Sequence, residues 1–204
     1  VPAFASLYGP MDHLAGHLRR YRQRELQQML ADGLGQILLL QYFNSLGGFT
    51  PDGREYAIYL GPNTHTPAPW VNVIANPTFG ALVSETGSGF TWYGNSQRNR
   101  LTQWSNDPVM DPPSEAVYIR DEETGVYWTP TPSPIREETA YRARHGAGYT
   151  VFEHNSQGIE QELTVFVPVD ENGGEPIKLQ RLRLSNDSSR RRRLSVTYYV
   201  EWTL

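Results

Sequence analysis

The stretch from Gly87 to Pro113 (GSGFTWYGNSQRNRLTQWSNDPVMDPP) gathers side chains that could bind a sugar. Its aromatic, amide, guanidinium and carboxylate residues are Trp92, Tyr93, Asn95, Gln97, Arg98, Asn99, Arg100, Gln103, Trp104, Asn106, Asp107 and Asp111. The C–H faces of a sugar stack on flat aromatic rings, while planar polar groups exchange hydrogen bonds with its hydroxyls. The residue types therefore favour a carbohydrate-binding surface.

The same stretch also has a purely structural interpretation. Asn, Asp, Pro and Gly are ordinary loop residues, and Asn and Asp side chains bind their own backbone. On this interpretation the tryptophan rings plug the edge of a β-core. We assign Trp92, which falls in a predicted strand, to the core, and Trp104 to contact with substrate or a second subunit. Composition alone leaves both interpretations open.

Signatures of catalysis are missing from the sequence. The chain has no cysteine, so a disulfide framework and a thiolate metal site are excluded. Gly87-Ser88-Gly89 lacks the pattern of a nucleophile elbow. His13 and His17 are four residues apart, but no acidic third ligand follows at motif spacing, which favours surface or capping histidines. No carboxylate is singled out as a general acid, and we expect neither a cofactor nor a metal.

The charge of the chain excludes broad classes of partner. A formal net charge of -4 gives no attraction to nucleic acid or to an anionic membrane surface. The basic run Arg190 to Arg193 lacks aromatic interleaving, so a solvated hairpin turn after residues 186–189 is favoured over a nucleic-acid site. The longest apolar candidate, Ile37 to Leu40, is far too short to span a membrane. We expect no membrane contact by this segment.

Two regions differ in periodicity. Apolar residues recur at spacings near three and four from Met11 to Ala31, which predicts an amphipathic helix ending near Gly33 and Gly35. Residues 1–35 are therefore assigned to a helical linker and residues 36–204 to a β-domain. The chain begins with Val and ends inside a strand-like pattern, so we expect a piece of a longer protein, with the β-domain truncated at its C-terminus.

Short segments rich in aromatic and β-branched residues follow, separated by turn residues. The predicted strands are Gln36 to Asn44, Glu55 to Leu60, Trp70 to Ile74, Gly80 to Ser84, Gly89 to Tyr93, Ala116 to Arg120, Val126 to Thr129, Tyr149 to His154, Ile159 to Val167, Lys178 to Leu184 and Leu194 to Trp202. The first two are expected to form a hairpin whose connection includes Gly47-Gly48. A second hairpin is expected around a four-residue turn at 155–158. This order predicts a mainly β, antiparallel sandwich.

Several motifs resemble one known family. They include TPAPWVNVIANP (66–77), SETGSGFTW (84–92), WSNDPV (104–109), YIRD (118–121), YWTPT (127–131) and HGAGY (145–149). The region from about Gln36 to Leu204 resembles the N-terminal part of family 94 glycoside phosphorylases, formerly glycosyltransferase family 36. Within that family it is most similar to the phosphorylase-like region of cyclic β-1,2-glucan synthases and to β-1,2-oligoglucan phosphorylases.

The resemblance implies a galactose-mutarotase-like β-supersandwich followed by an (α/α)6 barrel that carries the general-acid Asp. It further implies inverting phosphorolysis with inorganic phosphate as co-substrate, and a homodimer in which the sandwich borders the partner's active site. Contacts to a glucan or oligosaccharide are then expected from Gln97, Arg98, Arg100, Trp104, Asn106 and Asp107.

We therefore expect a non-catalytic carbohydrate-associated domain of a glucan-acting enzyme that is inactive as this chain alone. The alternative is a free-standing carbohydrate-binding module; intrinsic sugar mutarotation is disfavoured because fold does not carry function. A cytoplasmic location is expected, with membrane association of the parent protein if it is a cyclic glucan synthase.

Overall fold

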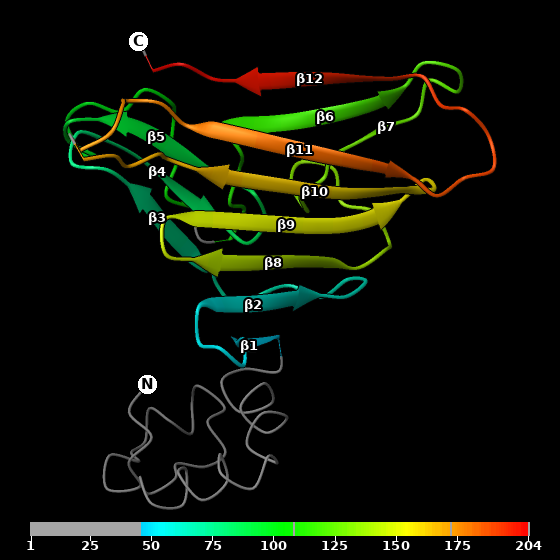
Figure 1. The fold of residues 1–204 in the computed structure, drawn as a ribbon, viewed down its shortest axis with the longest axis horizontal. Helices are drawn as coiled ribbons and strands as arrows, with labels where there is room; N and C mark the ends of the chain where they lie inside the picture. Colours follow the sequence, from blue (N-terminus) through cyan, green and yellow to red (C-terminus); the bar gives the residue numbers. More distant parts are fainter. Residues whose placement is uncertain (1–45, 108, 172, 204) are drawn as a thin grey trace, which may run out of the picture.

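The structure, a computed structural model, describes residues 46–107, 109–171 and 173–203 (Figure 1). The strands in this part are β1 (Gly47–Phe49), β2 (Glu55–Leu60), β3 (Val71–Ala75), β4 (Phe79–Ser84), β5 (Gly89–Tyr93), β6 (Glu115–Asp121), β7 (Tyr127–Trp128), β8 (Tyr141–Gly146), β9 (Tyr149–Ser156), β10 (Ile159–Phe166), β11 (Leu179–Asn186) and β12 (Leu194–Val200). The described residues contain no helix, and the predicted mainly β class is confirmed.

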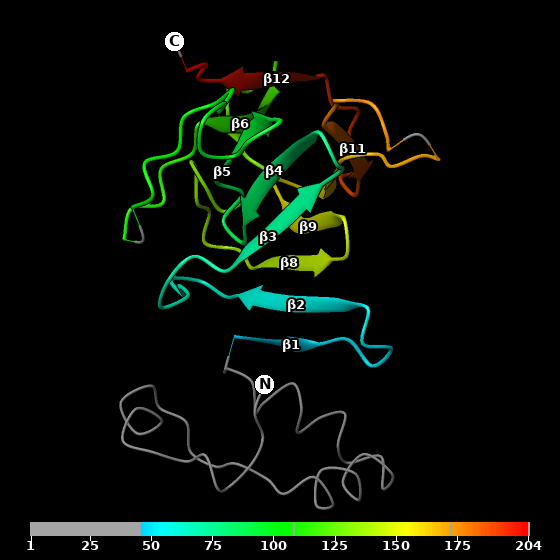
Figure 2. The ribbon, with the colours of Figure 1, turned by 90° about the vertical axis from the view of Figure 1, so that its left-hand side faces the viewer.

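The strands form three sheets in which all neighbouring strands are antiparallel. A six-stranded sheet has the order β1-β2-β8-β9-β10-β11, and two three-stranded sheets have the orders β12-β6-β7 and β3-β4-β5. In Figure 1, β12 and β6 lie above the long strands of the large sheet. Figure 2 shows β3 and β4 running obliquely to β2 and β8.

Apolar side chains meet in two buried clusters on the inner face of the six-stranded sheet. The larger cluster lies against β3-β4-β5 and includes Ile58 and Phe79. The smaller cluster lies beneath β12-β6-β7 and consists of Ile119, Trp128 and Ile159. Along β10, for example, every second side chain is buried on the inner face. Both small sheets therefore cover the same face of the large sheet, which gives a sandwich.

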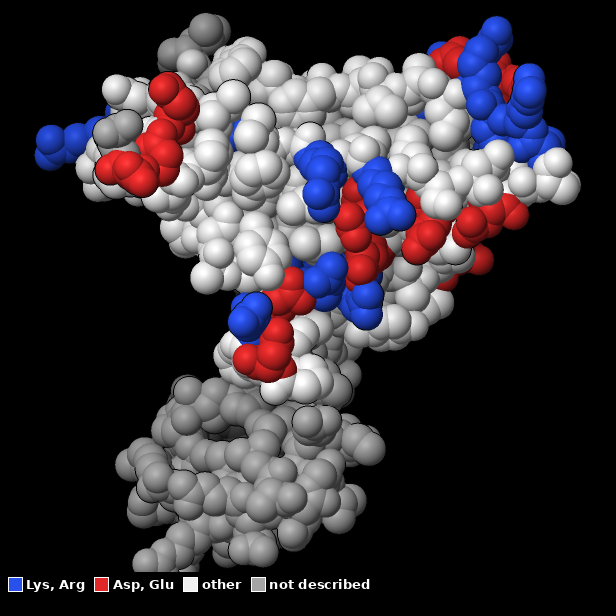
Figure 3. All heavy atoms as spheres, in the orientation of Figure 1, with Lys and Arg blue, Asp and Glu red and all other residues white. Residues whose placement is uncertain are grey.

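The outer face of the six-stranded sheet carries paired charges. Arg144 binds Glu55 at 2.6 Å and Glu153 at 3.3 Å, and Arg142 forms an ion pair with Glu153 as well. Figure 3 shows acidic and basic side chains next to one another across the centre of this view. The mixed signs leave no strongly basic or acidic patch over these strands.

The hairpin of β9 and β10 is confirmed, with a tighter turn than expected. Ser156 pairs with Ile159, so only Gln157 and Gly158 lie between the paired residues. Both have positive φ, 54° and 72°, as in the type I′ turns that match the twist of two antiparallel strands. The alternating pattern on both sides of the turn predicted the hairpin. The length of the turn could not be predicted from it, because that length depends on the backbone conformation of Gln157 and Gly158.

Three sequence expectations for the strands differ from the structure. Gly47 and Gly48, expected in a connection, lie in β1 and pair with β2. The strand β8 was not predicted, because Arg142 and Arg144 obscured the pattern of the segment; their neighbours Tyr141 and Ala143 are buried. The last strand, β12, ends before the predicted boundary at Trp202.

The basic run after β11 is not a hairpin turn. Since β11 pairs with β10 and β12 pairs with β6, residues 187–193 cross from one sheet to another. Asp121, which is fully buried, forms ion pairs there with Arg190 at 2.9 Å and Arg192 at 2.7 Å. This part of the run anchors the crossover.

The predicted helix, its linker assignment (1–35), the strand at 36–44 and the two histidines at 13 and 17 lie outside the described residues. Within the described residues no helix could cross a membrane.

Candidate functional site

Residues 94–114 join β5 to β6 and contain the predicted site. Their first turn is held by Asn95, whose Oδ1 accepts hydrogen bonds from the backbone N–H of Gln97 at 3.0 Å and of Arg98 at 2.9 Å. The backbone carbonyl of Asn95 also accepts from the N–H of Asn99 at 3.0 Å. The turn is therefore fixed from within, and the side chains of Gln97 and Arg98 stay exposed.

Two carboxylates of the loop serve its own backbone and anchorage. Asp107 accepts hydrogen bonds from the N–H groups of Met110 at 3.1 Å and Val109 at 2.9 Å, which lower the pKa of its carboxyl group. Asp111 accepts a hydrogen bond from the hydroxyl of Ser84, at the end of β4, at 2.7 Å. Asp107 makes the local backbone contacts that the structural interpretation of the sequence expects, and Asp111 anchors the loop to the end of β4.

An aromatic stack underlies the middle of the loop. The ring of Trp104 lies 4.8 Å from that of Phe90, nearly parallel to it at 18°, and Trp92 touches the same Phe90 ring at 5.3 Å. The guanidinium of Arg100 lies 5.3 Å from the Phe90 ring and 5.5 Å from the Trp104 ring. Such cation–π contacts stabilise by about 0.5–1 kcal/mol at exposed sites. Trp104 and Arg100 thus have a structural role.

The segment after β12 runs along this loop. Thr102 forms an antiparallel bridge with Trp202, and the N–H of Thr203 donates to the carbonyl of Leu101 at 3.0 Å. The side chain of Trp202 is 62% exposed beside the loop. Sequence reasoning treated Trp202 only as the end of a strand, since nothing in the sequence reveals that its ring faces solvent.

The six residues predicted to contact sugar divide by exposure. Gln97, Arg98 and Asn106 are exposed, and Arg100, Trp104 and Asp107 are half-buried. Arg100 and Trp104 are brought into contact by the stack, whereas Gln97 and Arg98 share the turn held by Asn95 and Asn106 lies further along the loop. The residues free to meet a ligand are therefore mainly those at the tips.

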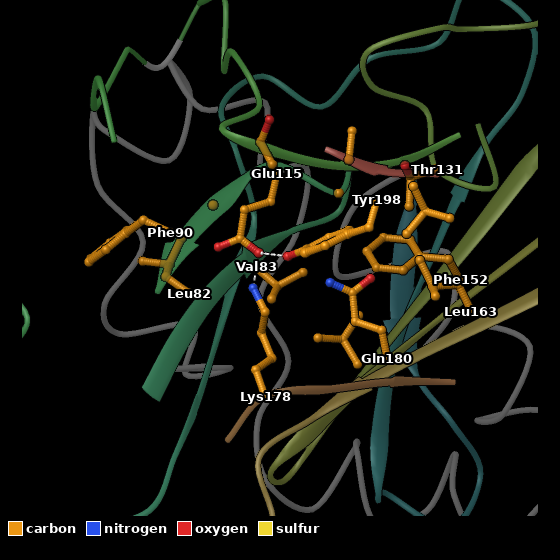
Figure 4. A pocket seen from close by; sticks show the side chains of 16 residues that line it. Leu82, Val83, Phe90, Glu115, Thr131, Phe152, Leu163, Lys178, Gln180 and Tyr198 are labelled. Carbon is orange, nitrogen blue, oxygen red and sulfur yellow. Dashed lines mark hydrogen bonds and ion pairs between the residues drawn. The ribbon is translucent and has the colours of Figure 1, made fainter. Parts of the chain in front are cut away.

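A buried polar network lies beneath the loop (Figure 4). Glu115 forms an ion pair with Lys178 and accepts hydrogen bonds from Thr91 at 2.6 Å, from Thr102 at 2.9 Å and from Tyr198. Lys178 also donates to Thr91 at 2.8 Å. Glu115 is thereby joined to side chains from β5, β12 and the segment before β11.

This network is built to hold charge inside the fold. Burial would raise the pKa of Glu115, but the charge of Lys178 and the hydrogen bonds from Lys178, Thr91 and Tyr198 lower it overall. Burial and the same carboxylate raise the pKa of Tyr198. The adjoining cavity measures about 30 Å³, which is the room of a water molecule and not of a sugar.

Another carboxylate, Glu85, is 1% exposed. Burial raises its pKa, although its Oε2 accepts a hydrogen bond from the N–H of Trp70 at 2.7 Å and its Oε1 one from the hydroxyl of Thr66. A general acid needs both a raised pKa and contact with the leaving group, and Glu85 has no access to a ligand. Among the described residues no three or more His, Asp or Glu side chains gather as metal ligands.

The fold and this loop define a class: an all-β antiparallel sandwich with polar and aromatic residues displayed on one connection. The chain belongs to the glycosyl hydrolase 94 family, whose supersandwich domain matches residues 54–204. The resemblance drawn from the sequence motifs is confirmed.

Relatives of known activity share this segment. The chain is 42% identical over 166 residues to the cyclic beta-(1,2)-glucan synthase NdvB of Rhizobium meliloti (strain 1021). It is 31% identical over 160 residues to N,N'-diacetylchitobiose phosphorylase of Vibrio proteolyticus, and 32% identical over 161 residues to solabiose phosphorylase of Paenibacillus borealis.

These matches cover most of the chain but little of each relative. The match to the glucan synthase covers 81% of this chain and 6% of the synthase. The matches to the diacetylchitobiose and solabiose phosphorylases cover 77% and 78% of this chain and 19% and 20% of those enzymes. The chain is therefore similar to one domain of enzymes that act on carbohydrates.

Proposed function

We propose that this chain is the non-catalytic supersandwich of a glucan-acting phosphorylase or glucan synthase, and that residues 94–111 border the glucan site of the whole enzyme. The observation that carries the proposal is the arrangement of the loop. Its backbone is fixed by Asn95, Asp107 and Asp111, while Gln97 and Arg98 extend freely into solvent. A rigid base with exposed planar polar groups suits recognition of sugar hydroxyls.

The non-catalytic role is supported by the state of the carboxylates. In the described residues the one carboxyl group with a raised pKa, that of Glu85, is buried. In the proposed enzyme an (α/α)6 barrel of the same polypeptide supplies the general-acid Asp and binds inorganic phosphate. Phosphate then acts as the nucleophile in an inverting reaction, so a single protein carboxylate suffices. The enzyme is a cytoplasmic homodimer in this proposal, or membrane-associated if it is a cyclic glucan synthase.

Kinetics of the full-length enzyme test the loop. We expect the double variant Gln97→Ala/Arg98→Ala to reduce kcat/KM for a β-1,2-gluco-oligosaccharide by about tenfold, a loss of about 1.4 kcal/mol. The melting temperature should stay unchanged, because both side chains are exposed. Arg54→Ala, in the exposed β1–β2 connection, is the matched control and should leave kcat/KM unaltered. Unchanged kcat/KM in the double variant would contradict the proposal.

The contacts in the aromatic stack give a second comparison in the same assay. Arg100→Ala and Trp104→Ala remove packing against Phe90 as well as any contact with sugar. If the loop borders the site, each should reduce turnover by more than its loss of stability explains. Equal losses of turnover and stability would assign both residues to the core alone.

Calorimetry separates this domain from a free-standing carbohydrate-binding module. A module would bind the oligosaccharide as an isolated chain with a submillimolar Kd that the Gln97→Ala/Arg98→Ala variant weakens. A domain that supplies only one border of a site should show no submillimolar binding at this loop, because the opposing contacts are missing.

A further inference from the structure

The outer face of the sheet β12-β6-β7 contains a hollow of about 480 Å³, which lies apart from the loop discussed so far. The residues lining it are Tyr118, Arg120, Gly125, Tyr127, Ser195 and Thr197. Its volume is within the range of about 300–1,000 Å³ that is usual for ligand pockets. None of the residues predicted to contact sugar lies on this surface.

Strand register explains why these side chains share one face. Arg120 pairs with Tyr127 on one side and with Ser195 on the other, and Tyr118 pairs with Thr197. Their neighbours along the strands, such as the buried Ile119 and Trp128, point into the core instead. Directly paired residues on one face have Cβ atoms about 4.5–5.5 Å apart, so the five side chains form a continuous patch.

Aromatic rings border the hollow. Tyr127 is 59% exposed and pairs with Arg120. Tyr118 lies two residues before Arg120, which makes it a diagonal neighbour of Tyr127 at about 7–8 Å. Tyr199 lies on the same face of β12, two residues beyond Thr197, and is 43% exposed. Exposed tyrosines carry an apolar ring and a polar hydroxyl, which is the combination that sugar faces and hydroxyls require.

The polar groups of the hollow are available and nearly balanced in charge. The side chain of Arg120 is exposed and makes no hydrogen bond or ion pair among the described residues. Ser195 donates a hydrogen bond to Glu122 at 2.5 Å, so one carboxylate is bound to a lining residue of a hollow that contains one guanidinium. A phosphate-bearing ligand would need excess positive charge, whereas a neutral polyhydroxyl chain can use both donors and acceptors.

From this combination we infer that the face formed by Tyr118, Arg120, Tyr127, Ser195 and Thr197 is a binding surface for a neutral oligosaccharide. The rings stack on sugar faces, Arg120 donates to ring or hydroxyl oxygens, and the hydroxyl of Thr197 completes the contacts. Gly125, on the β6–β7 side, borders open space, since a Cβ there would meet no atom within 4 Å. An exposed, shallow surface of this kind binds weakly, with Kd values in the range of about 1 mM.

The test is an NMR titration of the ¹⁵N-labelled 204-residue chain with a β-1,2-gluco-oligosaccharide, a cello-oligosaccharide and a chito-oligosaccharide in separate arms. The β-1,2-linked sugar is chosen because of the proposed function. The inference about the surface does not depend on that function. We expect saturable shifts of backbone amides in β6, β7 and β12 with at least one of the three sugars. Shifts confined to residues 94–111 would overturn this inference.

Matched variants sharpen the result. Tyr127→Ala and Arg120→Ala should each raise the Kd by about tenfold, and Tyr127→Phe, which keeps the ring, should bind nearly as well as the original chain. Tyr59→Ala is the control, because Tyr59 on β2 is also 59% exposed and lies on a different sheet. Each variant is first compared by its amide spectrum to establish that it is folded.

Three outcomes would overturn the inference. The first is no saturable shift with any arm up to about 10 mM sugar, some tenfold above the expected Kd. The second is an equal loss of binding in Tyr59→Ala. The third is a set of shifts in β6, β7 and β12 that follows protein concentration instead of sugar concentration, which would make this face a self-association surface.

Discussion

Asp121, the last residue of β6, is fully buried against the 187–193 crossover. Its carboxylate forms ion pairs with the guanidinium groups of two arginines there. The hydrogen bond from the backbone N–H of Glu123 and those from Arg192 and Arg190 lower the pKa of its carboxyl group to about 2. The same group titrates near 3.9 in an unfolded chain. A lowered pKa means that the ionised form stabilises the fold above about pH 4 and that this stabilisation is lost as the pH falls toward 2.

We therefore expect Asp121→Asn to lower the melting temperature most at pH 5–7, with a difference from the original chain that narrows toward pH 2. Thermal unfolding followed by circular dichroism over this pH range measures the difference. Glu160→Gln, which removes an exposed carboxylate on β10, should show little effect at any pH. A difference for Asp121→Asn that stays constant with pH would exclude the ionised carboxylate as its cause.

At the residue scale the sequence predicted some roles and missed others. Asn95 and Asp107 bind neighbouring backbone groups, as their residue types suggest, because such contacts are local. The stack of Trp104 on Phe90 and the hollow around Arg120 and Tyr127 depend on strand register between distant segments. Residue type alone therefore identified the candidate loop but not which of its side chains are free.

The turn between β9 and β10 provides a prediction at the scale of an element. Gly158 has a φ of 72°, a conformation that costs other residues roughly 1–2 kcal/mol. A Cβ at this position would also lie 3.2 Å from the Cβ of Ser188. We expect Gly158→Ala to reduce the free energy of unfolding by about 1–2 kcal/mol, measured by urea denaturation.

Gly125→Ala is the control for that substitution. Gly125 has a similar φ of 75°, but its added Cβ would meet no neighbour within 4 Å. Its loss of stability should therefore reflect backbone strain alone and should not exceed that of Gly158→Ala. A Gly158→Ala chain as stable as the original would show that the turn can adopt another conformation without cost.

Strand prediction succeeded where turn residues frame an alternating pattern. Strand β5 was predicted at its observed bounds, because Gly87, Gly89 and Gly94 mark its ends and all three have positive φ. Strand β8 was missed because the long side chains of Arg142 and Arg144 on its outer face resemble a polar loop. In the structure these arginines find Glu55 and Glu153 on the adjacent strands, a pairing that the sequence does not reveal.

The ion pair of Lys178 and Glu115 belongs to the scale of the whole molecule, because its hydrogen bonds join β5 and β12, which lie in two different sheets, to the segment before β11. Removing one partner of a buried ion pair typically costs about 3–5 kcal/mol, since the other charge loses its partner. We expect Lys178→Met to reduce the free energy of unfolding by this amount, measured by urea denaturation.

The double variant Lys178→Met/Glu115→Gln tests the cause of that loss. Because it leaves no unpaired buried charge, it should be more stable than the sum of the two single losses predicts. Strictly additive losses would mean that the two groups act independently, contrary to their contact in the structure.

The division into three sheets could not be read from the sequence. Strands β11 and β12 follow one another in the chain, yet β11 is an edge strand of the six-stranded sheet and β12 pairs with β6 in another sheet. The sequence shows strands and turns, whereas sheet membership depends on which apolar faces meet. The predicted sandwich class was correct because it needs only the number and spacing of strands.

The pairing of β6 with β12 has a consequence for the time course of synthesis. Residues 115–121 leave the ribosome well before residues 194–200, to which they will pair. At about 5–20 residues per second, β6 waits on the order of ten seconds for this neighbour. Throughout that interval one edge of β6 lacks its partner strand and could pair with other chains.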